Sequence, residues 1–539
     1  MGVHIPQQIR ILQLFFLLSG VLFLTENHSL AQGINSPTPP NIILIVADDL
    51  GWNDIGYHGS EINTPTLDSL AAKGLELNRF YAHPACSPTR SALMTGKAPV
   101  RLGFHTPLAK NNRKGLPLSE KILPQYLKDI GYHTSLIGKW HLGRFSKEYL
   151  PNQRGFDHFY GYLTGGIGHF DHVHGGGLDW QRNGKTVEEE GYTTHLLTDE
   201  AVSQIRKQRE GKPFFMEVCY SAPHIPNEAP EEAILEYQHL PEKKRQVHAA
   251  MVSEIDKGVR RILHEVHAYD LLSNTIIWFL SDNGGSTGEG YSKNVQHIVK
   301  QANYFFNPPF PIPFLEFLRR SVESAASDNS PLRGGKGSVY EGGIRVPSFI
   351  YAPAFLLPQK VESRITVNDI LPTLLTASGL PEVENLGTDG ISQWAYLRGE
   401  APAVQVDYLT HAILGNEAYL TDSVKLIIPT DGPAELYHVF DDPTEKRNLA
   451  DEHEALVAEL VEKVKAFPRG ESVHDPLWKT ALDPDFFGGK IDREPYAEVE
   501  GVNAGPIHPA HVILPALLFF LLGLIGFLLR RWLWKNRKS

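Results

Sequence analysis

Acidic, basic and imidazole side chains follow directly after several predicted strands of this sequence. Apolar, β-branched runs at 42–47, 134–137, 214–220 and 275–280 indicate buried strands. The side chains that follow these runs are Asp48 and Asp49, Lys139 and His141, His224, and Asp282 and Asn283. One Asp at a strand end is commonly a turn residue, but four such sets are difficult to explain in that way. Because ligands of open α/β sheets bind beyond the carboxyl ends of the strands, we expect these side chains to form an active site.

The carboxylates of this set have the chemistry of a metal site. Asp48 and Asp49 are adjacent at the end of a buried strand, where two carboxylates repel each other unless a cation lies between them. With Asp282 and Asn283 they offer hard oxygen ligands, which suit Ca²⁺ or Mg²⁺ better than zinc. The alternative is that both acidic segments form turns or helix caps, where Asp is favoured for its short acceptor side chain.

Lys139 and His141 lie two residues apart between Gly138 and Gly143. A histidine such as His141 is more often structural when it stands alone. The neighbouring ammonium group makes the pair a candidate for anion binding or proton transfer.

A candidate nucleophile is Cys86, the first residue of the segment Cys-Ser-Pro-Thr-Arg at 86–90. Pro88 can begin a helix and Gly96 can end it, so a helix with Cys86 at its N-terminus is predicted. A helix N-terminus favours negative charge, and Arg90 adds a cation one turn further on. This environment suits a nucleophile that attacks an anionic substrate. The alternative is a buried cysteine that acts as a small hydrophobic residue.

The Cys-x-Pro-x-Arg segment and its helix resemble the signature of the type I sulfatases, in which the cysteine is oxidised after translation to formylglycine. The resemblance extends from residue 41 to about 467 and includes blocks at 47–52, 138–143, 222–224, 281–285, 332–337 and 340–347. The order and spacing of these blocks make the match specific. The segment 49–54 with its His-Gly continuation is most similar to the arylsulfatase B, or N-acetylgalactosamine-4-sulfatase, type.

The resemblance implies a sulfuric ester hydrolase with one Ca²⁺ per chain. Its implied metal ligands are Asp48, Asp49, Asp282 and Asn283, with the modified Cys86 close to the ion. The hydrated aldehyde at position 86 would present a gem-diol, one oxygen of which attacks sulfur, and a formylglycine-generating enzyme would be needed for maturation. A plain cysteine lacks the second hydroxyl that eliminates the sulfate ester.

The resemblance also implies roles for the cations and histidines around this nucleophile. Arg90 would position the diol, and Lys139, Lys336 and His224 would neutralise the sulfate oxygens. His224 would also donate a proton to the leaving alcohol, and His141 would act as the base that expels sulfate. The implied substrate is a sulfated small molecule or saccharide, such as a sulfated polysaccharide or glycosaminoglycan fragment.

The implied fold is the α/β, alkaline-phosphatase-like fold, with a mixed sheet between helices and a smaller C-terminal domain. We expect a catalytic domain at 41–398, with helices at 66–73, 119–130, 198–209, 249–269 and 369–378 and a further strand at 346–350. We expect a C-terminal subdomain at 399–490, with a short antiparallel sheet that includes strands at 423–428 and 436–439. The amphipathic pattern at 452–467 predicts the helix that closes this subdomain.

Both ends of the chain carry targeting patterns. An apolar stretch at 11–24 after Arg10, with small residues at Ser29 and Ala31, predicts a signal peptide at 1–31; an N-terminal anchor is the alternative. After a linker at 491–511, an apolar run at 512–529 precedes a basic tail at 530–539, which predicts a transmembrane helix or a cleaved sorting signal. We therefore expect an exported protein on the periplasmic or extracellular face, anchored to the membrane by its C-terminal segment.

The composition excludes several classes of protein. The 539 residues are 42% hydrophobic and 21% charged, which is enough apolar content for a large core and excludes a disordered chain. Two cysteines exclude a disulfide framework and a Cys-rich zinc site. A net charge of -11 argues against a nucleic-acid partner.

Three features lie outside the family pattern. A long insertion at 286–331 contains an aromatic run punctuated by prolines at 304–314. It is either a lid or rim that grips substrate or lies on a membrane, or a surface insertion packed on its own domain. The segment 165–177 holds three histidines among glycines, which favours a flexible substrate-facing loop over a second metal site. Cys219, in the strand that leads to His224, is interpreted as a core residue.

Two other functions fit parts of the pattern. A phosphonate or phosphate diester hydrolase of the same superfamily shares the formylglycine and the metal, and both substrate classes present one negative charge. A membrane-tethered glycan-binding protein that keeps the fold without turnover is the non-enzymatic alternative. The presence of every catalytic position in this sequence argues against the second.

Overall fold

The computed structural model of this chain describes residues 39–475, except 111, 175–176, 208–210, 288–324, 381–382 and 414. The predicted signal peptide, the linker at 491–511, the apolar run at 512–529 and the basic tail lie outside these residues, as does most of the insertion at 286–331. No helix in the described part of the chain combines the length and the apolar character needed to cross a membrane.

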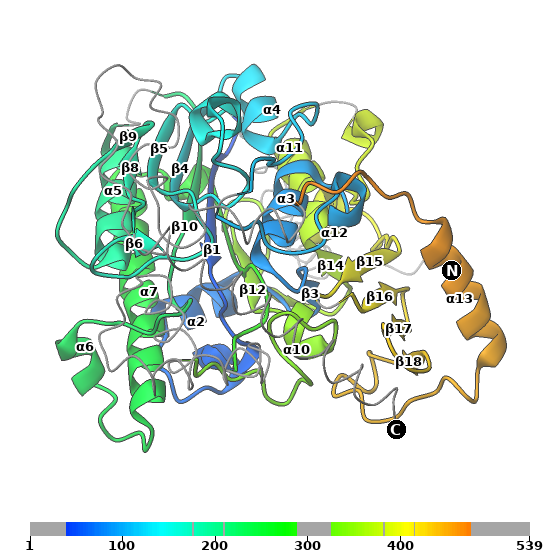
Figure 1. Cartoon of the computed structure of the whole chain (residues 1–539). Helices are drawn as coiled ribbons and strands as arrows, with labels where there is room; N and C mark the ends of the chain where they lie inside the picture. Colours follow the sequence, from blue (N-terminus) through cyan, green and yellow to red (C-terminus); the bar gives the residue numbers. More distant parts are fainter. Residues whose placement is uncertain are drawn as a thin grey trace, which may run out of the picture.

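A ten-stranded mixed sheet runs through the larger part of the molecule (Figure 1). In spatial order its strands are β13 (Gln359–Val361), β2 (Leu75–Leu77), β12 (Ser348–Tyr351), β11 (Thr275–Ser281), β1 (Asn41–Ala47), β10 (Phe214–Cys219), β4 (His133–Lys139), β5 (His158–Tyr162), β8 (Gln181–Arg182) and β9 (Lys185–Thr186). The five strands from β11 to β5 are parallel to one another, so their carboxyl ends share one edge. Strand β12 pairs antiparallel with β11, which makes the sheet mixed.

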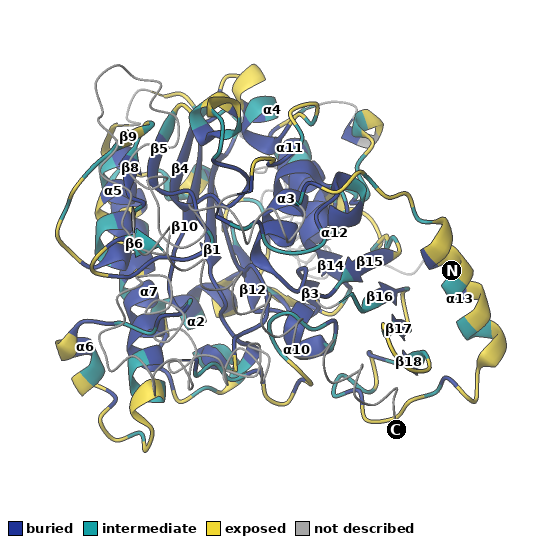
Figure 2. Ribbon diagram, viewed as in Figure 1, coloured by how far each residue is buried: buried dark blue, intermediate teal, exposed yellow. Residues whose placement is uncertain are grey.

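Helices cover both faces of this sheet because its central strands are buried on both sides. Along β1, Ile42, Leu44 and Val46 enter one core and Ile43 and Ile45 enter the other. The first core is covered by α3 (Cys86–Thr95), α4 (Leu123–Asp129), α11 (Ile370–Ala377) and α12 (Trp394–Leu397). The second is covered by α2 (Pro65–Lys73), α5 (Thr193–Lys207), α6 (Glu231–Leu235) and α7 (Lys243–Ala268). Figure 2 shows the buried strands between these two layers.

A small four-stranded antiparallel sheet lies beside the large one (Figure 1). It consists of β15 (Tyr408–His411), β16 (Glu417–Leu420), β17 (Lys425–Ile428) and β18 (Glu435–Tyr437), followed by α13 (Glu454–Ala466). Leu460 and Val464 of α13 pack against Leu426 of β17, and the outer face of α13 is exposed (Figure 2). The predicted α/β architecture, with a mixed sheet among helices and a small antiparallel sheet, is confirmed.

The remaining elements are short. They are the strand pairs β3 (Phe80–Tyr81) with β14 (Ile365–Thr366) and β6 (Val173–His174) with β7 (Gly177–Leu178), the helix α10 (Glu341–Ile344), and 3-10 turns at Trp52–Asp54, Gly56–His58, Pro99–Leu102, Lys147–Tyr149, Pro151–Gln153, Leu272–Asn274, Val367–Asp369 and Val383–Leu386.

The predicted strands are all present, whereas the ends of some helices differ from the prediction. Helix α4 begins at Leu123 instead of 119, where Pro124 occupies the first turn and Gln125 accepts a hydrogen bond from the Ile122 amide. Helix α7 begins at Lys243, six residues before the predicted start at 249, because its first turn is polar and partly exposed and so lacks an apolar pattern.

The strand that delivers Lys139 to the sheet edge depends on a close approach at Gly138. Gly138 has φ of 111°, and a Cβ atom there would lie 1.9 Å from the carbonyl oxygen of Cys219 in β10. We expect Gly138→Ala to lower the free energy of unfolding by roughly 3 kcal/mol, because the strands must separate and the backbone is strained. Denaturant titration measures this change.

The matched control is Gly59→Ala, at a glycine with φ of 94° and no atom within 4 Å of the added Cβ. We expect this control to cost about 1 kcal/mol, the cost of the left-handed backbone alone. Equal losses of unfolding free energy in the two variants would show that the close approach to Cys219 adds nothing to the cost of the Gly138 substitution.

Candidate active site

The sequence-predicted site residues meet at the carboxyl edge of the parallel strands. Asp48 and Asp49 follow β1, Asp282 and Asn283 follow β11, Lys139 is the last residue of β4, and His224 lies five residues after β10. Cys86 is the first residue of α3, and Lys336 reaches the same place from the segment between β11 and α10. The chain thus brings together side chains that are up to 288 residues apart in the sequence, from Asp48 to Lys336.

Each of the three carboxylates is paired with a cation from another element. Lys139 Nζ lies 2.7 Å from Asp48 Oδ2, and Lys336 Nζ lies 2.7 Å from Asp49 Oδ2. Arg90 donates from Nε and Nη2 to Asp282 Oδ2, at 3.1 and 2.8 Å, and from Nη1 to the Lys139 carbonyl oxygen at 3.1 Å. Five of these six side chains are buried and that of Lys336 is 17% exposed. Burial strengthens each attraction and makes the loss of either partner costly.

Two oxygen atoms in this cluster are buried without a hydrogen-bond partner among the described residues. They are Asp48 Oδ1 and Asn283 Oδ1. The amide of Asn283 is oriented by its nitrogen, which donates to Asp49 Oδ1 at 2.7 Å and to the Gly284 carbonyl at 2.9 Å, so the oxygen is left over. Buried oxygens without donors are unfavourable unless something else binds them, and a hard divalent cation is a suitable group.

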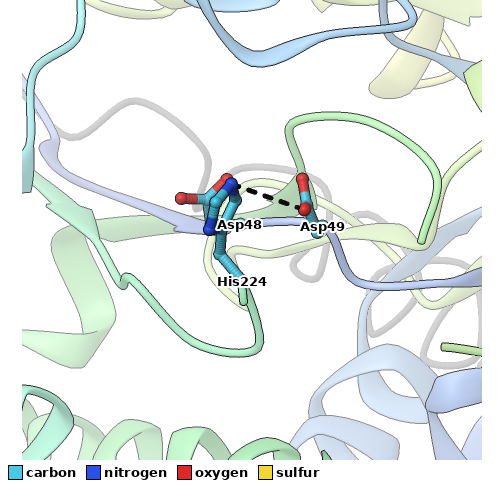
Figure 3. A group of neighbouring side chains, drawn as sticks. All are labelled: Asp48, Asp49 and His224. Atoms are coloured by element: carbon cyan, nitrogen blue, oxygen red, sulfur yellow. Dashed lines mark ion pairs between the residues drawn. The ribbon is translucent and has the colours of Figure 1, made fainter. Parts of the chain in front are cut away.

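A second geometric observation points to the same place. Ligand atoms of Asp48, Asp49 and His224 all lie within 4.8 Å of one another, and Figure 3 shows the three side chains together. His224 Nε2 is 3.7 Å from Asp49 Oδ2. The sequence assigned this histidine to sulfate binding and proton transfer, whereas the geometry also makes it a neighbour of the metal ligands.

The adjacent carboxylates Asp48 and Asp49 have opposite pKa shifts. Burial and the neighbouring charge of Asp282 raise the pKa of Asp48 to about 8, against the effect of Lys139. Burial also disfavours the charge of Asp49, but Lys336 and His224 overcome it and hold its pKa well below the usual range. The charged form of Asp48 is therefore the disfavoured one in the metal-free site, and a cation bound beside it would favour its ionisation.

Cys86 and His141 are both buried and lie against each other. Cys86 Sγ is 3.2 Å from His141 Nδ1, and the opposite ring nitrogen, Nε2, is 2.9 Å from the Leu108 carbonyl oxygen. Because a carbonyl can only accept, Nε2 carries the hydrogen and Nδ1 presents its lone pair to position 86. Ser87 Oγ donates to the His141 carbonyl and accepts from the Leu108 amide, which ties the helix start to both segments.

The backbone is strained at two residues of this cluster. Asp49 and His141 have φ values of 67° and 57°, in the left-handed region that non-glycine residues rarely adopt. Such conformations persist where surrounding contacts over-determine them, as the hydrogen bonds around both residues do here. The strain turns both side chains toward the shared edge of the sheet.

The comparisons with known proteins agree with this geometry. A family model described as Sulfatase matches residues 40–380. This chain belongs to the sulfatase family. Its fold is shared by a solved structure described as Ps i-CgsB in complex with k-i-k-neocarrahexaose, which is 29% identical with a TM-score of 0.70. The match covers 83% of this chain and 99% of that one.

Two curated sulfatases are also similar in sequence. Mouse arylsulfatase J is 33% identical over 389 residues, which cover 70% of this chain and 59% of that protein. Human N-acetylgalactosamine-6-sulfatase is 30% identical over 380 residues, covering 66% of this chain and 65% of its own length. The alignments therefore span less than two thirds of both relatives. They support the sulfatase family, but they do not support the N-acetylgalactosamine-4-sulfatase subtype that the segment 49–54 suggested.

In the described part of the histidine-rich segment, residues 165–174, two of the three histidines are buried and hydrogen-bonded. His169 is buried, with Nδ1 2.9 Å from Thr193 Oγ1 and Nε2 3.0 Å from the His224 carbonyl. His172 is also buried and stacks on Trp180. Within the described residues, these histidines form no group that could hold a second metal. The segment instead packs around the backbone of His224.

Sequence reasoning missed the residues that orient His141. The Leu108 carbonyl and the Ser87 hydroxyl contact it, but neither residue belongs to a periodic pattern or carries chemistry of its own. Cys219 is buried in β10, as predicted, and its Sγ lies 3.3 Å from Oε1 of the buried Glu217.

We expect both thiols to be protected in the folded chain when Cys86 is unmodified. Burial raises the pKa of Cys86 above its usual value and raises that of Cys219 further. Iodoacetamide near neutral pH should therefore label neither residue in native protein and both in urea, as measured by intact-protein mass spectrometry. Rapid labelling of native Cys86 would contradict the buried geometry.

Proposed function

We propose that this protein hydrolyses sulfate monoesters of a sulfated saccharide, with a formylglycine made from Cys86 as nucleophile and a bound Ca²⁺. The observation that carries the proposal is the position of Cys86, between the lone pair of His141 and three buried cation–carboxylate pairs. Such a site binds an anion, activates an oxygen nucleophile and offers a base beside it.

Two groups beyond the twenty amino acids complete the chemistry. Formylglycine at position 86, when hydrated, supplies one hydroxyl that attacks sulfur and a second that later allows sulfate to leave. Asp48, Asp49, Asp282 and Asn283 would hold the divalent cation, which supplies positive charge that favours an ionised hydroxyl. The two unpartnered oxygens of Asp48 and Asn283 are the reason why these residues fit it.

His141 has the properties of the base. Burial and the charge of Lys139 lower its pKa well below the ordinary value, so the ring is neutral near neutral pH. Its Nδ1 lone pair faces position 86, where it can take the hydroxyl proton as sulfate departs.

His224 has the properties of the acid once substrate is bound. Its Nδ1 lies 2.6 Å from the Ile225 carbonyl and so carries a hydrogen, which leaves Nε2 to exchange a proton with the leaving alcohol. Burial and Lys336 lower the pKa of His224 in the free protein. The negative charge of a bound sulfate ester would shift the pKa of His224 upward, in the direction that general-acid catalysis requires.

The three cations have two kinds of role. Lys139, paired with Asp48, and Lys336, paired with Asp49, supply positive charge for the sulfate oxygens. Arg90 binds Asp282 and the Lys139 carbonyl, so it fixes α3, and with it position 86, relative to β4 and β11.

The substrate class is supported by the relatives. One curated relative is named N-acetylgalactosamine-6-sulfatase, and one solved relative is described in complex with k-i-k-neocarrahexaose. Both names refer to saccharides, which favours a sulfated saccharide for this chain. We further propose that it is exported, matured by a formylglycine-generating enzyme, and held at the membrane by residues 512–529.

The catalytic proposal is tested by parallel kinetics and peptide mass spectrometry. We expect active protein to carry an aldehyde in place of the thiol at position 86 and to prefer nitrophenyl sulfate over a phosphodiester analogue in kcat/KM. Cys86→Ala should lower kcat by at least roughly a thousandfold, because it removes the nucleophile. An unmodified thiol in fully active protein, or preference for the phosphodiester, would overturn the proposal.

The metal site is tested by thermal denaturation. Saturating Ca²⁺ should raise the Tm of metal-free protein by roughly 3 °C, because a ligand at a hundred times its Kd stabilises the native state by about 2.7 kcal/mol. Asn283→Leu should abolish this shift, since it removes an unpartnered oxygen. The control Asn63→Leu makes the same change at an exposed position and should keep the shift. An equal shift in both variants would place the ion elsewhere.

A further inference from the structure

The segment that carries Lys336 lies between the two sheets. We call residues 332–345 the Lys336 loop. On the catalytic side, the Lys336 amide donates to the Gly285 carbonyl at 3.1 Å, and the Gly337 amide donates to the Pro84 carbonyl at 2.7 Å. The position of the Lys336 ammonium group therefore depends on how this loop is held.

The other side of the loop is held by the small sheet. Arg333 donates to the Tyr437 hydroxyl at 3.0 Å and stacks on the ring of Tyr340. Tyr340 donates to Glu435 of β18 at 3.0 Å. These contacts are partly exposed, and they flank a buried contact that is much stronger.

The buried contact is an ion-pair cluster of Lys425, Glu341 and Glu445, which we call the Lys425 cluster. Lys425 Nζ, from β17, lies 3.0 Å from Glu341 Oε1 and 2.7 Å from Glu445 Oε1. The Glu341 amide donates to Glu445 Oε2 at 2.8 Å, and Tyr81 donates to Glu341 Oε2 at 2.8 Å. The side chains of all three cluster residues are fully buried.

We propose that Lys425 is a positioning residue for catalysis, which holds Lys336 against Asp49 through Glu341. This inference rests on the proposed function, in which Lys336 contributes charge to sulfate binding. Glu341 is the first residue of α10 and lies five residues after Lys336. A buried carboxylate requires its partners, so Glu341 cannot move without separating charges in the absence of water.

The geometry assigns a catalytic task to the small sheet. The Lys336 ammonium reaches Asp49 from a loop whose near end is bound to the segments after β11 and before α3, and whose far end is bound to β17 and β18. Displacement of a charged group by about 1 Å can cost on the order of a hundredfold in rate. Lys425 of the small sheet thus helps to position a catalytic group that belongs to the large domain.

The test compares variants of the full-length mature protein. Lys425→Met removes the buried ammonium group, and Lys425→Met/Glu341→Gln removes charge from both partners. Because either can impair folding, the third variant is Tyr340→Phe/Arg333→Met, which loosens the loop through partly exposed contacts only. The matched control is Leu460→Ala, which weakens the packing of α13 on the small sheet without touching the loop.

Two readouts are measured below the melting temperature of every variant. The first is acetic anhydride labelling of Lys336, followed by mass spectrometry; its side chain is 17% exposed and ion-paired, so it should be protected in the parent protein. The second is kcat and KM on nitrophenyl sulfate. The labelling of Lys336 does not require enzymatic activity. It therefore tests the positioning of Lys336 even if the proposed sulfatase reaction is wrong.

We expect the three loop variants to label Lys336 faster and to lose roughly 10- to 100-fold in kcat/KM. The Leu460→Ala control should lower Tm while leaving labelling and kcat/KM near the parent values. The proposal is overturned if Lys336 stays protected from labelling in all three loop variants. It is also overturned if Leu460→Ala changes the labelling rate and kcat/KM as much as the loop variants do.

Discussion

Three buried carboxylates at one edge of the central sheet impose the constraint on which the rest of the structure depends. Asp48, Asp49 and Asp282 lie within one small volume away from water, where like charges repel strongly. No single element supplies enough positive charge to balance them. Arg90 comes from a helix, Lys139 from a strand and Lys336 from a distant loop, so the charges can be balanced only when the whole fold has assembled.

This constraint also explains features that look unrelated to chemistry. The left-handed backbone at Asp49 and His141 and the close strand approach at Gly138 are unfavourable locally. Each turns or moves a charged or imidazole group toward the same edge. The hydrophobic cores on both faces of the sheet stabilise the fold enough to offset this local strain.

The sequence predicted those parts of the site whose signals are local. Strand ends at Asp48, Lys139 and Asp282 follow from apolar runs, and the position of Cys86 at a helix start follows from Pro88. The orientation of His141 by the Leu108 carbonyl could not be predicted, because every residue has a backbone carbonyl and the residue type does not indicate which one accepts. Strands β15 and β16 were missed for a similar reason, since their pairing is determined by contacts with the rest of the small sheet. The glycines at 165–177 indicated a flexible loop, but they gave no sign that His169 and His172 are buried and hydrogen-bonded.

The burial of Cys86 restricts when its side chain can be modified relative to folding. With 2% of its surface exposed and His141 against its sulfur, the residue is out of reach of any modifying enzyme once α3 has packed. The proposed oxidation to formylglycine would therefore have to precede folding, before α3 packs around Pro88. A chain that folded before this proposed step would keep its thiol and would have to unfold before the thiol could be oxidised.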